Sequence, residues 1–373
     1  MRAVLVVVVA ASACSATATP PTQAQLGKLV FEDTSLSNPA GQACADCHTA
    51  RTAFRDPEDE HSQSMGAVAG RFGARNAPTL LYAQLVPAPY DDPELGRVGG
   101  LFWDGRAASL EDQVAGPLLN PLEMNNADRA AVVAHVRAAS YAPAFAELFG
   151  PGVLDDADRG FTAIAAVLAA YERSPELAPF TSRYDRYLAG TDTLSAAELR
   201  GLAIFDDPSR GGCARCHPDQ PGPGGEPPLF TTFAYANLGV PRYPNNKFYI
   251  QSTNADGDRY IDHGLGAITS RASDDGKFRI PTLRNIARTA PYGHNGYFAN
   301  LPYALEFIAN RTVGSYDVAT CSRARGATVR CPWPEPEVAA TVDARAGSRA
   351  LSPDELADLA AFLGTLTDEP PPR

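Results

Sequence analysis

Two short motifs of the form Cys-x-x-Cys-His occur in this chain, and both have the residue types needed to hold a metal cofactor covalently. Two thiols at this spacing can each add to a vinyl group of haem, and the histidine that follows can ligate the iron. A four-cysteine zinc site or a thioredoxin-like cysteine pair would not explain a histidine after both pairs. The sequence therefore predicts two c-type haems, one held by Cys44, Cys47 and His48 and the other by Cys213, Cys216 and His217.

The first residues of the chain have the composition of a secretory signal. Residues 1–19 carry Arg2, an apolar stretch and then a Ser/Thr/Ala/Pro-rich stretch, so we expect a signal peptide there. Cys14 follows Ala-Ser-Ala, which resembles a bacterial lipoprotein cleavage site, and a signal-peptide cysteine that is lost on cleavage is the alternative. Export agrees with haem attachment, so we expect a periplasmic protein or a membrane-tethered lipoprotein. In an oxidising compartment, Cys321 and Cys331 would pair as a disulfide.

The overall composition is that of a globular protein and limits its partners. The chain has 373 residues, of which 45% are apolar and 20% charged, and no apolar run in the mature part is long enough to span a bilayer. The net charge of −11 argues against nucleic acid, which binds to basic surfaces.

The segments that precede the two motifs repeat the same plan. Residues 25–33 (QLGKLVFED) and 199–207 (LRGLAIFDD) align in position, which indicates a duplicated unit. Ser195 and Glu198 form a capping box before the second segment and predict a helix there. Helices are also predicted over 161–172 and, after the capping box at Ser352, over 356–363.

This order of helix, haem motif, irregular loops and terminal helix is that of a cytochrome c domain. The predicted fold is mainly α, with two cytochrome c-like domains that each carry one covalently bound c-type haem. We place their boundaries at 20–180 and 181–373. Residues 175–190 read as a linker region, 218–228 as a flexible loop, 369–373 as a disordered tail, and 235–249 as irregular wrapping around a cofactor.

The segment 102–124 (FWDGRAASLEDQVAGPLLNPLEM) decides between an electron carrier and an enzyme. Gln113 and Pro117 lie four residues apart on a helix predicted to begin near Ser109. The segment closely resembles the diheme cytochrome c peroxidase and MauG family. The resemblance implies that Trp103 relays electrons between the haems and that Gln113, Pro117 and Glu123 line the distal side of the N-terminal haem.

These implied roles have a chemical rationale. Cleavage of a peroxide bound at iron needs a proton to leave the inner oxygen and reach the outer one, which a desolvated carboxyl group can bring about. Glu123 is therefore the expected general acid and base, and Gln113 the hydrogen-bond donor to bound oxygen species. Without the resemblance, Glu123 would read as a surface carboxylate and Trp103 as a core aromatic residue.

Further signatures extend the resemblance over nearly the whole mature chain. They are 75–79 (RNAPT), 277–285 (KFRIPTLRN) and 289–296 (TAPYGHNG). In relatives the asparagine of the first signature and two carbonyl groups of the last bind calcium between the domains, which implies a calcium ion at Asn76, Thr289 and Pro291. Carbonyl oxygens suit this hard cation. The alternative is that Asn76 only caps a turn.

Two positions depart from the family pattern and concern the haem ligands. Family members hold a removable histidine ligand seven residues before the arginine of the first signature, and Val68 stands there. We therefore expect an open, high-spin N-terminal haem unless His61 reaches it. Methionine or tyrosine is expected fourteen residues after His294, where this chain has Ile308. Substitute ligands for the C-terminal haem are Tyr303, Tyr297 and His263.

Three functions remain open at this stage. The first is a peroxidase that reduces hydrogen peroxide at the N-terminal haem, with electrons that a cytochrome c or cupredoxin delivers through the C-terminal haem. The second is a MauG-like enzyme that uses peroxide to oxidise a side chain of a partner protein, which the two departures favour. The third is a non-catalytic electron-transfer cytochrome, which gains nothing from an open haem face beside a buried acid.

Overall fold

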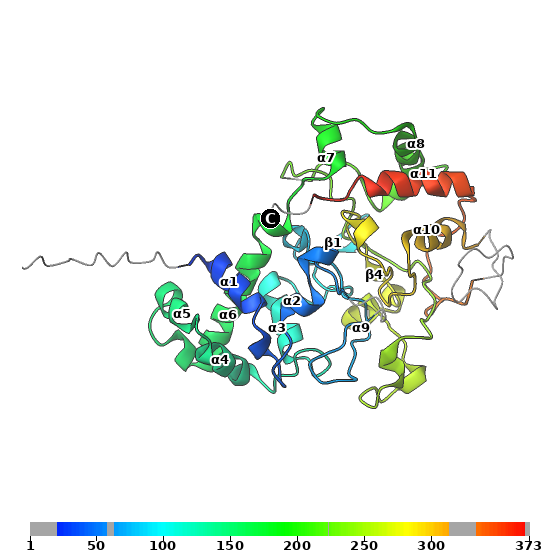
Figure 1. Cartoon of the computed structure of the whole chain (residues 1–373). Helices are drawn as coiled ribbons and strands as arrows, with labels where there is room; N and C mark the ends of the chain where they lie inside the picture. Colours follow the sequence, from blue (N-terminus) through cyan, green and yellow to red (C-terminus); the bar gives the residue numbers. More distant parts are fainter. Residues whose placement is uncertain (1–20, 58–62, 223, 313–332, 370–373) are drawn as a thin grey trace, which may run out of the picture.

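The structure is a computed structural model that describes residues 21–57, 63–222, 224–312 and 333–369, and its regular structure is mainly helical (Figure 1). Among these described residues, no helix is long and apolar enough to cross a membrane. Cys14, His61, Cys321 and Cys331 lie outside the described residues. The α-helices are α1 (Gln23–Phe31), α2 (Cys44–Cys47), α3 (Leu110–Leu119), α4 (Arg129–Ala138), α5 (Ala142–Phe149), α6 (Ala157–Glu172), α7 (Arg183–Leu188), α8 (Ala196–Asp206), α9 (Leu265–Thr269), α10 (Leu301–Asn310) and α11 (Pro353–Gly364).

Helix α1 packs against α6 through a very close backbone approach. A Cβ atom built on Gly27 would lie 1.8 Å from the carbonyl oxygen of Val167, so only glycine allows the two helices to come this near. The Phe31 ring of α1 meets the Tyr171 ring of α6 edge to face, with their centroids 5.1 Å apart.

Helices α8 and α11 repeat this arrangement in the second half of the chain. A Cβ atom on Gly201 would lie 2.0 Å from the carbonyl oxygen of Asp358, and the rings of Phe205 and Phe362 meet edge to face at 5.2 Å. The segments that carry Gly27 and Gly201 are the two that repeat in the sequence. The duplicated sequence pattern thus corresponds to a duplicated helix crossing (Figure 1).

The helix ends agree with the capping residues in the sequence. Ser195 and Ser352 each form a capping box with the glutamate three residues on, at the starts of α8 and α11, as predicted. Ser109 caps α3 by accepting a hydrogen bond from the backbone N–H of Asp112.

The region predicted as a linker contains regular structure instead. Pro175–Leu177 forms a 3₁₀ turn and Arg183–Leu188 forms helix α7, which begins at a capping box of Ser182 and Asp185. The two largest clusters of buried apolar side chains divide within this region. One draws on residues from Leu26 to Leu177 and the other on residues from Tyr184 to Leu366.

Strands are few and short, and most of the chain between the helices is irregular. β1 (Tyr90–Asp92) pairs with β2 (Gly96–Val98), and β3 (Tyr235–Ala236) pairs with β4 (Phe278–Arg279), both antiparallel. Apart from β3 and a 3₁₀ turn at Lys247–Ile250, the stretch 235–249 has no regular structure, in agreement with the sequence. These irregular segments line the cavities described below.

Candidate active site

The first haem motif forms the short helix α2, and its histidine is oriented by a backbone hydrogen bond. Nδ1 of His48 lies 2.9 Å from the carbonyl oxygen of Phe54, so the ring donates there and leaves Nε2 available as a ligand. Burial lowers the pKa of His48, which keeps the imidazole neutral. Cys44 and Cys47 are not joined in a disulfide.

The second motif repeats this geometry on a 3₁₀ turn, Cys213–Arg215. Nδ1 of His217 lies 2.7 Å from the carbonyl oxygen of Phe230, and burial lowers the pKa of His217 to about 4. A neutral imidazole with one nitrogen fixed by a carbonyl is the form that ligates iron.

Each motif opens into its own cavity. Cys44, Cys47 and His48 line a cavity of about 470 Å³, and Cys213, Cys216 and His217 line one of about 250 Å³. Unbridged thiols, a histidine with a free Nε2 and a cavity beside them are what a covalently attached haem requires. The residues present at both places fit this group.

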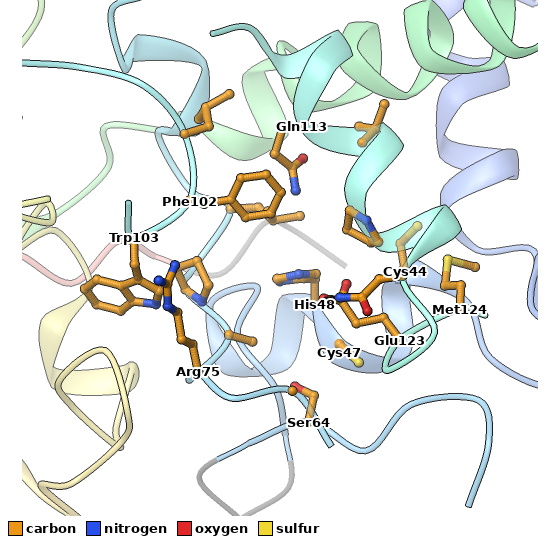
Figure 2. A pocket seen from close by; sticks show the side chains of 18 of the residues that line it. Cys44, Cys47, His48, Ser64, Arg75, Phe102, Trp103, Gln113, Glu123 and Met124 are labelled. Atoms are coloured by element: carbon orange, nitrogen blue, oxygen red, sulfur yellow. Dashed lines mark hydrogen bonds between the residues drawn. The ribbon is translucent and has the colours of Figure 1, made fainter. Parts of the chain in front are cut away.

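The sequence-predicted distal residues come together in the first cavity (Figure 2). Gln113 and Pro117 lie on α3, and Glu123 follows in the turn after it. Gln113, Pro117 and Glu123 all line the cavity that His48 also lines. The structure therefore places these three side chains in one cavity with the first motif.

The environment of Glu123 favours a carboxyl group that can exchange protons. Burial raises its pKa, and a hydrogen bond from the Asn120 side chain opposes this, with Nδ2 of Asn120 2.6 Å from Oε1 of Glu123. The positive charge of Arg106 also lowers the pKa of Glu123.

The loop where relatives hold the removable histidine packs against the Glu123 turn. The backbone N–H of Ala67 donates to the carbonyl oxygen of Glu123 at 2.8 Å, and a Cβ on Gly66 would lie 2.3 Å from the carbonyl oxygen of Leu122. Val68 lies at the tip of this hairpin, where its carbonyl accepts from Arg71, and it does not line the cavity. Position 68 thus offers no ligand.

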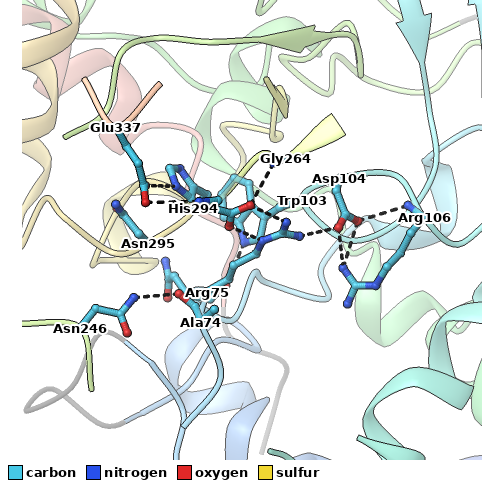
Figure 3. Close-up of polar contacts among 12 residues, drawn as sticks. Ala74, Arg75, Trp103, Asp104, Arg106, Asn246, Gly264, His294, Asn295 and Glu337 are labelled. Atoms are coloured by element: carbon cyan, nitrogen blue, oxygen red, sulfur yellow. Dashed lines mark hydrogen bonds and ion pairs between the residues drawn. The ribbon is translucent and has the colours of Figure 1, made fainter. Parts of the chain in front are cut away.

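Trp103 lines both cavities and lies among fixed polar groups. Beside it, Arg75 forms ion pairs with Asp104 and Asp262, each with a nitrogen to oxygen distance of 2.7 Å (Figure 3). The Arg75 guanidinium lowers the pKa of the buried Asp262 to about 2, although burial alone would raise it. Nη1 of Arg106 also pairs with Asp104 and lies 3.0 Å from each of its carboxylate oxygens.

The residues expected to bind calcium are brought together in part. Nδ2 of Asn76 donates to the carbonyl oxygen of Pro291 at 2.8 Å and is 3.5 Å from that of Gly293. Thr289 lies on the same segment and lines the second cavity with Asn76 and Pro291. Backbone carbonyl oxygens and the amide oxygen of Asn76 are of the type that calcium binds. Rotation of the Asn76 amide group would exchange its nitrogen and oxygen and so turn the oxygen toward such an ion. Among the described residues no cluster of three or more His, Cys, Asp or Glu side chains could hold a metal.

Ile308 lines the second cavity from α10, at the position where relatives have a ligand. The suggested substitutes, Tyr303, Tyr297 and His263, do not line it. The two tyrosines pack with other aromatic rings, and Nδ1 of His263 lies 2.6 Å from Oδ1 of Asp275. Their positions do not support them as ligands.

Several cavity residues were missed by the sequence analysis. The ring of Phe102, which has a left-handed backbone (φ 64°), lies 3.5 Å from the Arg106 guanidinium. Glu172, at the end of α6, is buried with its pKa raised to about 8 by burial. The half-buried Arg279 lines both cavities. Asn120 could have been found from its place three residues before Glu123, but the others carry no local signal.

Comparison with known proteins places this arrangement in one class, the di-haem peroxidases. The family model described as di-haem cytochrome c peroxidase matches residues 21–193. Methylamine utilization protein MauG of Paracoccus denitrificans is 40% identical over 353 residues, which cover 92% of this chain and 88% of that protein. Cytochrome c551 peroxidase of Nitrosomonas europaea is 29% identical over 352 residues, which cover 93% and 80%.

A solved structure agrees with this placement. The crystal structure of the diheme peroxidase BthA from Burkholderia thailandensis superimposes with a TM-score of 0.80 and 35% identity, over 93% of this chain and 86% of that one. The chain therefore belongs to the di-haem cytochrome c peroxidase and MauG family, and it is an oxidoreductase of the cytochrome-c peroxidase type. Membership of this family implies haem cofactors.

Proposed function

We propose that this protein reduces hydrogen peroxide at the N-terminal haem with electrons delivered through the C-terminal haem. The observation that carries the proposal is the meeting of Gln113, Pro117 and Glu123 with His48 in one cavity. Cys44 and Cys47 would attach the haem and His48 would ligate its iron, and the bound haem would supply a binding place for peroxide and the electrons that its reduction needs.

Glu123 moves the proton that this cleavage requires. Reduction of one peroxide to two waters consumes two electrons and two protons, and the first proton shift is from the inner to the outer peroxide oxygen. The Glu123 carboxylate takes the proton from one oxygen and returns it to the other. The hydrogen bond from Asn120 holds that carboxylate in place, and the raised pKa makes it a better acceptor of the first proton.

The remaining side chains of the cavity orient peroxide and control access to it. The amide of Gln113 can donate a hydrogen bond to the bound oxygen. Pro117, one turn further along α3, has no backbone N–H and adds apolar surface. Val68 does not line the cavity, so position 68 supplies no ligand there, which supports an open N-terminal haem.

Trp103 is the proposed relay between the two haem sites. It lines both cavities, and its indole N–H is held by the carbonyl oxygen of Asn76 at 2.8 Å. The proposed calcium ion at Asn76, Thr289 and Pro291 would fix the same segment. We further propose two cytochrome c-like domains, 20–180 and 181–373, in an exported periplasmic protein, with Cys14 as a candidate lipid anchor.

A MauG-like reaction is the second candidate. The relative named MauG is 40% identical to this chain, against 29% for the cytochrome c551 peroxidase of Nitrosomonas europaea. In that case the electrons come from a side chain of a partner protein rather than from a small cytochrome c or cupredoxin. A non-catalytic carrier is disfavoured by the presence of the half-buried Glu123 in the cavity beside His48.

One experiment separates these functions. The purified, haem-loaded protein is mixed with hydrogen peroxide and reduced cytochrome c. Steady oxidation of the cytochrome supports the peroxidase, whereas a long-lived oxidised state without turnover supports the MauG-like enzyme. No reaction of the haems with peroxide would contradict both and leave the carrier.

A further inference from the structure

Glu172 is a buried acid in the first cavity that the proposed reaction does not use. It lies at the C-terminal end of α6, has 4% of its surface exposed, and lines the cavity together with Leu168 one turn before it. Within the described part of the chain, its Oε2 has no hydrogen-bond partner. A buried polar atom in this state costs free energy, so the residue needs a reason other than packing.

The second half of the chain has a leucine at the equivalent place. Tyr171 of α6 corresponds to Phe362 of α11, because each ring packs on the phenylalanine of the partner helix in its own half. The next residue along the helix is Glu172 in the first half and Leu363 in the second. Leu363 is also buried and lines the second cavity. The fold therefore accepts an apolar side chain here, and the carboxyl group is particular to the first site.

The protonation of Glu172 is set mainly by its burial. Burial raises its pKa to about 8, whereas Arg173 lowers this pKa and Glu111 of α3 raises it. Arg173 and Glu111 pair with each other at 2.6 Å, so their charges act on Glu172 in opposite directions. Arg173 follows Glu172 directly and is exposed, so solvent can exchange protons close to the buried carboxyl group.

The other elements that pack near the end of α6 supply one group that senses Glu172. Lys28 of α1 pairs with Glu176 at 2.8 Å, and the charged residues of α4 do not act on Glu172. Burial and the charge of Glu172 both raise the pKa of the Cys44 thiol. Glu172 is therefore within electrostatic reach of the place where the first haem would be attached.

A haem at this place changes its charge by one unit when it gains or loses an electron. Loss of an electron adds positive charge and favours the carboxylate form of a nearby buried acid, and gain of an electron favours the protonated form. The effect is reciprocal, so the protonation of the acid changes the affinity of the site for an electron by the same free energy.

We infer that Glu172 is a redox-linked proton site, which takes up a proton from solvent when the haem held by His48 gains an electron and releases it when the electron leaves. The inference rests on the proposed function, which places a haem and the delivery of electrons at the first motif. One electron and one proton enter together, so the net charge of the cavity does not change. Reduction of peroxide consumes electrons and protons in equal numbers, and Glu172 brings the two into the same cavity.

The test is a spectroscopic redox titration of the haem-loaded protein without peroxide, at pH values on both sides of about 8. In the native protein the potential of the first haem should fall as the pH rises, because the carboxylate stabilises the oxidised state. E172Q cannot release a proton and E172L carries the residue of the second half, so both should lose this dependence. Proton uptake on reduction, followed with a pH indicator, should fall in both variants.

The second haem is the internal control, because Leu363 stands at the place of Glu172 there. Its potential should be the same in the native protein and in both variants. Glu123 is the rival group, since it lines the same cavity, has a raised pKa and also acts on Cys44. If E172Q and E172L keep the native dependence, or if E123Q alone loses it, Glu172 is not the linked group.

Haem content separates this inference from the proposed function. Mass spectrometry that finds no haem at Cys44 and Cys47 would contradict both. Full haem content and normal reaction with peroxide, together with titrations that Glu172 does not affect, would contradict only the inference. E172Q keeps the size of the side chain, so it remains informative should E172L alter the packing of the cavity.

Discussion

The indole nitrogen of Trp103 donates a hydrogen bond to the carbonyl oxygen of Asn76, 2.8 Å away, and both residues line both cavities. The same Asn76 side chain reaches Pro291 in the second half of the chain. Asn76 therefore fixes Trp103 between the two haem sites and connects the first half of the chain to the second.

This relationship predicts that W103F uncouples the two sites. Phenylalanine keeps an aromatic ring in place but loses the hydrogen bond and the easily oxidised indole. We expect peroxide still to react at the first site, while electrons from the second site no longer follow at the native rate. Rapid-mixing absorbance of both haems measures this, and a native rate of electron transfer in W103F would contradict the relay.

Replacement of Glu123 by glutamine should slow the reaction with peroxide. General acid and base catalysis contributes a factor of roughly 10²–10⁴, so E123Q should lose at least about 100-fold in the rate constant. E111Q is the control, because Glu111 on α3 is partly exposed and pairs with Arg173 at 2.6 Å. Equal rates in E123Q and native protein, with equal haem content, would remove Glu123 from the mechanism.

The hydrogen bond from Asn120 sets the pH range in which Glu123 is ionised. This bond stabilises the carboxylate, so N120A should raise the pKa of Glu123 further. Because the carboxylate form accepts the first proton, the fall in rate at low pH should move to higher pH in N120A. A pH profile of the peroxide reaction checks the direction of the shift, and an unchanged profile would show that Glu123 does not titrate in this step.

The Arg75 pairs should make stability depend on pH in the acid range. The folded-state pKa of Asp262 is lowered to about 2, so its contribution is complete above its ordinary value near 4 and is lost as the pH falls. D262N should cost roughly 3–5 kcal/mol at neutral pH, since it leaves buried charge unbalanced. Urea unfolding between the lowered pKa of Asp262 and its ordinary pKa should show that D262N has lost the pH dependence of the native protein.

The two helix crossings predict matched losses of stability. G27A and G201A place a methyl group 1.8 Å and 2.0 Å from a backbone carbonyl oxygen, where no flexible side chain can give way. We expect each to lower the free energy of unfolding by at least about 1–3 kcal/mol. G364A is the control, because nothing lies within 4 Å of a Cβ there, and thermal unfolding of all three variants compares them.

The sequence predicted the parts of the fold that local signals determine. Capping boxes at Ser195 and Ser352 marked the starts of α8 and α11, and the repeated segments marked the duplicated crossing. The capping box of Ser182 and Asp185 was present in the predicted linker but was not recognised, so α7 was missed. Local hydrogen bonds of this kind can be read from spacing alone.

Features that depend on tertiary contacts were not predictable. Arg75 and Asp262 are separated by 187 residues, and no local pattern indicates that they pair. Phe102 adopts a left-handed backbone without being glycine or asparagine, which the surrounding fold imposes. Glu172 is buried because α6 ends at the cavity, which becomes visible only when α1 and α3 pack beside it.

The most direct test of the central claim is electron paramagnetic resonance of the oxidised, haem-loaded protein before and after one equivalent of hydrogen peroxide. The account predicts a high-spin signal from an open N-terminal haem that disappears when peroxide is added, and that persists far longer in E123Q. A resting spectrum with only low-spin signals, unchanged by peroxide, would contradict it.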